Sequence, residues 1–239
     1  MSETNKVENG YQGGPPVQRA VTPGGHAQDT SQPAFPVYHR KFANPAPLGL
    51  LAFAGTTFML SLFNVSARGV SIPNAVIGMA LGYGGTAQFI AGIWEFASGN
   101  TFGATAFCSY GAFWWSFAIT LIPWFNVEGA FDSKYAAEGT HYFDQALGIY
   151  LACWFIFTFI MLAASFKSSL ALVLLFFFLD ITFLLLFVAY FTGNAKVTTA
   201  GGAMGIVTAA VAFYTGAAGL LSPDTSYFSL PVLDMSRKD

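Results

Sequence analysis

Residues 168 to 191 read SSLALVLLFFFLDITFLLLFVAYF, and Asp180 is the one charged side chain in this run. A helix needs about 20 apolar residues to cross a bilayer, so the run is long enough for one transmembrane helix. Comparable runs lie near residues 45 to 66, 74 to 97, 102 to 124, 144 to 165 and 199 to 221. The sequence therefore predicts an all-α membrane protein with six transmembrane helices per protomer.

The composition excludes several classes of protein. Of the 239 residues, 54% are apolar and 9% are charged, whereas a soluble domain has about 25% charged residues. A net charge of -2 provides no basic surface for nucleic acid. Cys108 and Cys153 lie in apolar runs and predict neither a disulfide framework nor a metal site. No local catalytic motif occurs, so we expect neither an enzyme nor a cofactor.

The distribution of Pro, Gly and basic residues divides the chain into three parts. Residues 1 to 43 are rich in Gly, Pro, Gln, Asn and Thr without apolar periodicity, which is typical of disorder. The excess of Lys and Arg at alternate helix ends favours cytoplasmic termini. We expect a disordered cytoplasmic tail over 1–43, a six-helix transmembrane transporter domain over 44–222 and a cytoplasmic C-terminal tail over 223–239.

A few polar residues lie at the ends or in the middle of the predicted helices. Asn44 and Pro45 suit a helix start, which is either structural or attractive to a small anion. Glu95 shares a helical face with Gln88 and either lines a pore or reaches water at the helix end. Asp180 lies at mid-membrane, where a charge is costly, and is either a proton carrier or a hydrogen-bonded structural residue.

Small residues form two stripes at helical spacing. One runs along the last predicted helix through Gly205, Ala209, Ala212, Gly216 and Gly219, and the other is the pair Gly78 and Gly82. Such stripes let helix backbones approach closely. They predict close packing within the protomer, and an oligomer interface would produce the same pattern.

Several motifs together resemble the acetate uptake transporter family, which includes succinate-acetate permeases of bacteria and acetate and ammonium transport proteins of fungi. The resemblance rests on Asn44 to Leu50 (NPAPLGL), Tyr83-Gly84-Gly85, Ala91 to Phe96 (AGIWEF), Gly99 to Gly103 (GNTFG), Ser109 to Trp114 (SYGAFW) and Thr182 to Leu186 (TFLLL). It covers about residues 42 to 222, and the long N-terminal tail is similar to that of the fungal members.

The resemblance implies a homo-hexamer in the plasma membrane, with one pore in each protomer. It also implies a hydrophobic constriction formed by Phe53, Tyr110 and Leu179, with Leu175 as the alternative for the last position. By the same resemblance and the polar faces described above, we expect a substrate path with Asn44, Pro45, Thr56, Thr57, Tyr83 and Gln88. Glu95 and Asp180 are the candidates for proton coupling.

The function implied by this resemblance is transport of acetate and related short monocarboxylates. Moving an anion into an inside-negative cell costs about 2.3 kcal/mol per 100 mV, so we expect coupling to a proton, with channel-like kinetics. Export of ammonium or ammonia is an alternative, because Glu95, Asp180 and Tyr110 are suitable ligands for ammonium. A second alternative is an acetate sensor that signals through the N-terminal tail.

Overall fold

The computed structural model describes residues 43–135, 142–223 and 226–235, with the side chains of 132–135 left aside. The prediction of a disordered tail over residues 1–43 lies outside this part, apart from Ala43. The longer helices are α1 (Ala46–Asn64), α3 (Gln88–Ala97), α4 (Thr101–Leu121), α6 (Tyr142–Ser165), α7 (Leu170–Thr192) and α8 (Ala195–Leu220). The shorter ones are η1 (Ala67–Gly69), η2 (Pro73–Ala75), α2 (Val76–Leu81), η3 (Gly82–Ala87), η4 (Pro123–Phe125) and α5 (Val127–Tyr135).

The helical class is confirmed, and the structure contains five or six segments that could cross a membrane. Five stretches within the described residues are long and apolar enough to cross a membrane: Ala46–Asn64, Pro73–Ala97, Tyr142–Ser165, Leu170–Thr192 and Ala195–Leu220. A sixth is obtained if α4 is taken with the segment Pro123–Phe131, which is bent from it by 73°. The chain is therefore an integral membrane protein with five or six spanning segments, and the ends of these segments agree with the predicted ones within a few residues.

One regular helix was predicted for the second span. The structure instead has η2, α2, η3 and α3 in succession over Pro73–Ala97. A π-helical segment, η3, joins α2 to α3 and contains Gly84 and Gly85. A Cβ on Gly84 would stand 2.6 Å from Thr56 Oγ1, so the glycine allows α1 to approach. Segments of π-helix change the register of the side chains that follow.

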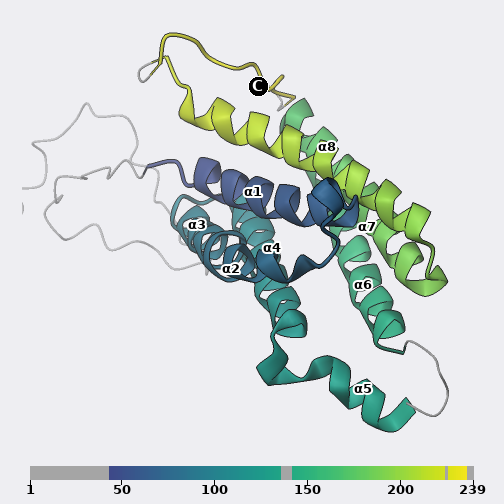
Figure 1. Ribbon diagram of the computed structural model, residues 1–239. Helices are drawn as coiled ribbons and strands as arrows, with labels where there is room; N and C mark the ends of the chain where they lie inside the picture. Colours follow the sequence, from purple (N-terminus) through teal and green to yellow (C-terminus); the bar gives the residue numbers. More distant parts are fainter. Residues whose placement is uncertain (1–42, 136–141, 224–225, 236–239) are drawn as a thin grey trace, which may run out of the picture. The chain divides into compact units, whose positions relative to one another are not determined.

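The long helices surround a common interior (Figure 1). Going round it, α6 packs on α7, α7 on α8, α8 on α1, and α1 on the α2–η3–α3 span, which packs on α4. The remaining seam, between α4 and the pair α6 and α7, is bridged by large side chains, as in the edge-to-face contact of Phe113 with Phe183. Aromatic rings therefore close this seam.

The glycine stripe of α8 packs inside the protomer, as predicted. Ala209 and Ala212 are fully buried, and a Cβ on Gly216 would stand 2.9 Å from Leu51 Cγ. The other stripe behaves differently: a Cβ on Gly78 or Gly82 would meet no atom within 4 Å in the described chain. The prediction of packing within the protomer is wrong for this pair, because both glycines point away from the bundle.

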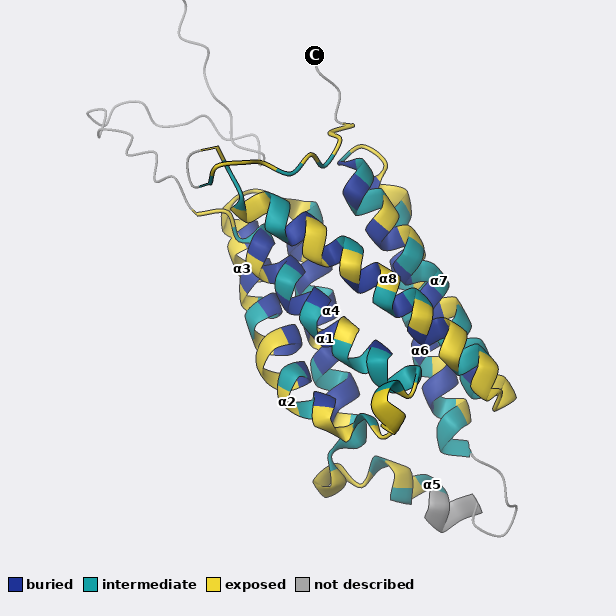
Figure 2. Cartoon of the chain, turned by 45° about the horizontal axis from the view of Figure 1, so that its top comes forward, coloured by how far each residue is buried: buried dark blue, intermediate teal, exposed yellow. Residues whose placement is uncertain are grey.

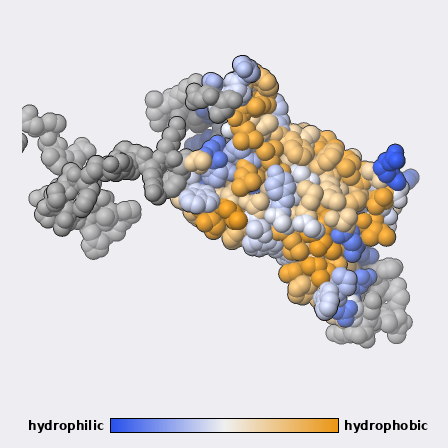
Figure 3. All heavy atoms as spheres, turned by 60° about the vertical axis from the view of Figure 1, so that its left-hand side comes forward, coloured by the Kyte–Doolittle hydropathy of each residue, from blue (hydrophilic) through white to orange (hydrophobic). Residues whose placement is uncertain are grey.

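Burial follows the helix faces, with buried residues turned inward and exposed ones outward (Figure 2). Many outward residues are large and apolar, among them Ile93, Phe96, Ile156, Phe159 and Phe177. Hydrophobic residues also cover much of the face seen in Figure 3. In water such an exposed apolar surface would be unfavourable, so lipid or a neighbouring subunit is its natural environment.

The two ends of the bundle differ in their connections. At one end, called here the terminal side, lie the start of α1, the α3–α4 and α6–α7 turns and the end of α8. There the C-terminal segment pairs with the α6–α7 turn, since Leu170 N donates to Leu233 O at 2.9 Å and Met235 N to Ser168 O at 2.9 Å. At the other end, the α5 side, lie η1, α5 and the α7–α8 turn.

Candidate functional site

Two cavities lie inside the described helices, one toward each end. The terminal cavity has a volume of about 70 Å³, and the residues that line it include Ala46, Leu50, Phe53, Gln88, Glu95, Asn100, Tyr110, Leu172, Leu175 and Leu179. The α5-side cavity has a volume of about 440 Å³, and its lining includes Asn64, Ser66, Phe113, Phe117, Asp144, Phe183, Tyr190 and Thr199. The two cavities share no lining residue, so a barrier separates them.

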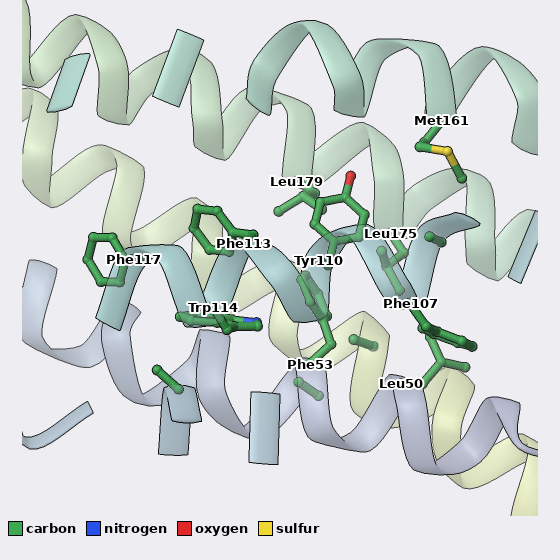
Figure 4. Close-up of a cluster of buried hydrophobic side chains, with 14 of the residues drawn as sticks. Leu50, Phe53, Phe107, Tyr110, Phe113, Trp114, Phe117, Met161, Leu175 and Leu179 are labelled. Atoms are coloured by element: carbon green, nitrogen blue, oxygen red, sulfur yellow. The ribbon is translucent and has the colours of Figure 1, made fainter. Parts of the chain in front are cut away.

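The barrier begins at Phe53, Tyr110 and Leu179, which come from α1, α4 and α7 and are at most 5% exposed. The Phe53 and Tyr110 rings are 5.8 Å apart between centroids. Figure 4 shows Tyr110 next to Phe53 and Leu179, with Leu50, Phe107 and Leu175 toward one end and Phe113 and Phe117 toward the other. We call Phe53, Tyr110 and Leu179 the collar. Leu175, the alternative position, lines the terminal cavity beside it.

A second apolar layer lies directly behind the collar. Phe113 is three residues after Tyr110 on α4, or about 4.5 Å along the helix, and Phe183 is four residues after Leu179 on α7. The rings of Phe113 and Phe183 meet edge to face with centroids 5.6 Å apart, and both line the α5-side cavity. A solute that passes between the cavities therefore crosses two layers of apolar side chains, and an unpaired charge is disfavoured there.

The Tyr110 ring is fixed by contacts with α6 that the sequence alone does not predict. Its hydroxyl shares a hydrogen bond of 2.8 Å with Thr158 Oγ1, which is fully buried. The ring also packs edge to face on Phe157, with centroids 5.4 Å apart. Thr158 could have been noticed as an isolated hydroxyl in an apolar helix, but no spacing rule connects it to Tyr110.

Replacing Thr158 with valine should lower the free energy of unfolding by about 1 kcal/mol, because the Tyr110 hydroxyl loses its partner at nearly constant side-chain volume. Thermal unfolding of the purified protein in detergent would measure the loss. In the double variant Tyr110→Phe with Thr158→Val the two effects should not add. Full additivity would mean that the two hydroxyls do not stabilise each other.

Two buried polar side chains of the terminal cavity come from one face of α3. Gln88 is 1% exposed and Glu95 is 2% exposed, and both line this cavity. The alternative in which Glu95 reaches water at the helix end does not fit this burial. Gly84 and Gly92, four residues before and four residues after Gln88, serve packing: a Cβ on Gly84 would meet Thr56, and a Cβ on Gly92 would stand 2.6 Å from Cys108 N.

The other residues of the expected substrate path do not line either cavity. The Asn44 side chain accepts a hydrogen bond of 3.0 Å from Ala46 N and so serves the start of α1. Thr56 donates to Ala52 O within α1, and Thr57 is buried with Oγ1 unpartnered among the described residues. Pro45 precedes Ala46, which does line the terminal cavity. Tyr83 is 37% exposed.

Asp180 lies one residue after Leu179 but lines neither cavity. It is partly buried, and its Oδ1 is buried without a hydrogen-bond partner in the described chain. It interacts electrostatically with Tyr110. Asp180 therefore stands next to Leu179 of the collar, and both roles expected for it, as a proton carrier and as a structural residue, stay predictions.

Charge along the route is limited to acids. Glu95 is the charged residue that lines the terminal cavity, and Asp144 is the one that lines the α5-side cavity. No lysine or arginine appears in the lining of either cavity within the part of the chain that the structure describes. A carboxylate on this route therefore meets amides, hydroxyls and carboxyl groups, and no fixed cation.

Comparison with known proteins identifies the family to which this chain belongs. The model of the GPR1/FUN34/yaaH family matches residues 26–237. The chain belongs to this family. It is 36% identical over 193 residues to the succinate-acetate/proton symporter SatP of Escherichia coli K12, covering 80% of this chain and 96% of that protein. A solved structure titled the bacterial acetate channel SatP matches with a TM-score of 0.68 and 34% identity over 80% of this chain and all of that one.

Fungal members of the GPR1/FUN34/yaaH family are more similar in sequence. Acetate permease A of Emericella nidulans is 50% identical over 200 residues, which cover 81% of this chain and 66% of that protein. Ammonia transport outward protein 2 of Saccharomyces cerevisiae is 50% identical over 199 residues, which cover 81% of this chain and 69% of that protein. The chain thus spans about two thirds of the length of the curated fungal relatives that it matches.

Proposed function

We propose that this chain transports acetate and related short monocarboxylates across a membrane, together with a proton and with channel-like kinetics. The observation that carries the proposal is the arrangement of two cavities on opposite sides of the collar Phe53, Tyr110 and Leu179. The names of relatives, an acetate permease, a succinate-acetate/proton symporter and an acetate channel, indicate the class of solute.

The side chains along the route between the cavities support transport of the substrate together with a proton. A carboxylate ion that crosses the two apolar layers is opposed by desolvation, and the acid Asp144 in the lining of the α5-side cavity repels it. Neutralisation by one proton removes both penalties and also the membrane-potential term of about 2.3 kcal/mol per 100 mV. The substrate and its proton would therefore cross the collar together.

Uptake of labelled acetate into vesicles that contain the purified protein tests this function. With the membrane potential clamped, an inward proton gradient should accelerate entry, and a dye inside the vesicles should report acidification in step with acetate. Protein-free vesicles give the background of acid that crosses the lipid. Acetate entry no faster than this background would refute transport, and entry that ignores the pH gradient would refute coupling.

Ammonium or ammonia export is the second candidate function. It is favoured by 50% identity to a relative named for outward ammonia transport and by the acidic, cation-free lining of both cavities. In the same vesicles, entry of labelled acetate should be measured with ammonium chloride and, as a control, with the chloride salt of another cation. Flux of ammonium should be measured with and without acetate. Acetate entry that is unaffected by ammonium would favour the monocarboxylate function, and ammonium flux that acetate does not inhibit would favour the alternative.

The assembly and its placement are part of the proposal. We infer a homo-hexamer in the plasma membrane, with both termini in the cytoplasm and the segments 1–43 and 223–239 as tails of the transporter domain 44–222. The outward-facing Gly78 and Gly82 and the exposed apolar helix faces suit contacts between subunits. Native mass measurement of the detergent-solubilised protein and protease access to a tag at either terminus in intact cells would test these statements.

Deleting residues 2 to 40 should leave acetate flux within about twofold of the full-length rate, because the described lining of both cavities comes from the transmembrane helices and the turns between them. The measurement is the vesicle assay, with protein amount normalised by immunoblot. If flux is kept but a cellular response to acetate disappears, the chain also acts as a sensor through its tail. Loss of flux itself would contradict a separable tail.

A further inference from the structure

Glu95 is the buried carboxyl group of the terminal cavity, and two successive hydrogen bonds through Asn100 hold it in place. Its Oε2 accepts a hydrogen bond of 2.8 Å from Asn100 Nδ2. Asn100 Oδ1 in turn accepts from Gly103 N at 3.0 Å, which caps the start of α4. The carboxyl group is thus tied to the α3–α4 turn rather than left to rotate at a helix end.

The second oxygen of this carboxyl group has no partner. Glu95 Oε1 is buried and makes no hydrogen bond within the described residues, although Glu95 is only 2% exposed and lines the cavity. Such an atom costs about 1–3 kcal/mol in stability if nothing occupies its hydrogen-bonding position. Glu95 therefore lines the cavity with one carboxyl oxygen held by Asn100 and the other without a partner in the described chain, and this arrangement is expected of a ligand-binding carboxyl group.

Among the residues that the structure describes, no basic group is placed to neutralise Glu95. The helices that pack on α3, namely α1 and α4 with the η3 segment, contain no Lys, Arg, Asp, Glu or His in the described chain. Across the cavity α7 carries Asp180, which does not line it, and Lys167 in the preceding turn is exposed. Tyr110 is the other ionisable residue in the lining. A proton is therefore the natural counter-charge of this carboxyl group.

We propose that Glu95 is the site at which the carboxyl group of the substrate exchanges its proton, an inference that rests on the proposed monocarboxylate transport. In one direction the Glu95 O–H bond breaks and its proton forms the O–H bond of the acid, which leaves toward the collar uncharged. The Glu95 carboxylate then takes a proton from water on the terminal side. In the other direction the acid arrives protonated and gives its proton to Glu95.

Gln88 provides the next polar contact on this route. It precedes Glu95 by seven residues on α3, which places it about 10 Å deeper along the helix axis. Its Oε1 is buried and also unpartnered in the described chain, and its amide offers both a donor and an acceptor to a neutral carboxylic acid. The acid therefore moves from Glu95 to Gln88 before it crosses the collar, and neither residue binds it through a fixed charge.

The test is Glu95→Gln in the full-length protein, reconstituted in vesicles with labelled acetate outside and a pH dye inside. The variant keeps the volume and the hydrogen bond with Asn100 but cannot release a proton. Net acetate entry should fall by about tenfold or more, and the remaining flux should no longer respond to an imposed pH gradient. Glu128→Gln, the same change on an exposed acid of α5, is the matched control and should behave as wild type.

Two further variants keep the result decisive if Glu95→Gln folds poorly. Glu95→Asp keeps an ionisable group and should transport more slowly than wild type with its proton response preserved. Asn100→Ser keeps a cap for α4 but removes the donor to Glu95, and should reduce flux several-fold. Proton-coupled acetate entry at the wild-type rate in Glu95→Gln overturns the inference and leaves the proposed function intact. Absence of acetate transport by the wild-type protein instead overturns the proposed function.

Discussion

Replacing Phe53 with alanine is expected to raise the ratio of lactate flux to acetate flux about tenfold, which corresponds to about 1.4 kcal/mol in relative barrier height. The Phe53 ring is 5% exposed and faces Tyr110 at 5.8 Å between centroids. Its removal opens the collar on the α1 side, where no other side chain of that bulk replaces it. Lactate exceeds acetate in size, so the wider opening benefits lactate more.

The measurement is entry of labelled lactate and labelled acetate into vesicles, compared at equal amounts of protein. Phe159→Ala is the matched control, because Phe159 is 58% exposed on the outer face of α6 and lines neither cavity. It should leave the ratio unchanged. An unchanged ratio in a correctly folded Phe53→Ala variant would show that the collar does not set selectivity and that Phe53 only packs.

Replacing Gly92 with valine is expected to destabilise the protein by about 3 kcal/mol or to prevent its folding. A Cβ on Gly92 would stand 2.6 Å from Cys108 N and 3.2 Å from Cys108 Cα. These are backbone atoms of α4, which cannot rotate aside, so α3 and α4 would have to move apart. Overpacking of a well-packed interior costs about 1–3 kcal/mol and occasionally more.

Thermal unfolding in detergent and the yield of monodisperse protein would measure this effect. Gly78→Val is the control, since a Cβ at Gly78 meets nothing within 4 Å; because valine has a slightly higher helix propensity than glycine, stability should change by less than about 1 kcal/mol. Equal stability of the two variants would mean that the close approach of α3 and α4 is not required. Loss of the oligomer in Gly78→Val with a stable protomer would assign this glycine to a subunit contact.

The sequence predicted the membrane class and the positions of the spans well, because hydropathy averages over about 20 residues and tolerates local exceptions. It also predicted the packing of α8, where Gly205 and Gly216 recur at helical spacing and do pack inside the protomer. It failed for Gly78 and Gly82. A stripe of small residues shows that a helix face is thin, but not which neighbour lies against that face.

The candidate site was only partly accessible from the sequence. The resemblance to a family supplied Phe53, Tyr110 and Leu179 as a group, and the structure brings these three together. The same reasoning put Thr56, Thr57 and Tyr83 on the substrate path, but they line neither cavity. Neighbouring positions on a helix point about 100° apart, so a motif can be correct as a motif and still contain residues that serve packing.

By itself the sequence determined that the chain crosses a membrane several times, that its spans contain few ionisable groups and that no fixed cation is available there. Those properties depend on side-chain chemistry and on the length of apolar runs. Only the tertiary structure decided that Thr158 holds Tyr110, that Asn100 holds Glu95 and that Glu95 lines a cavity with one oxygen unpartnered among the described residues. Such pairs are set by the rotation and depth of one helix against another, which no local pattern of residues encodes.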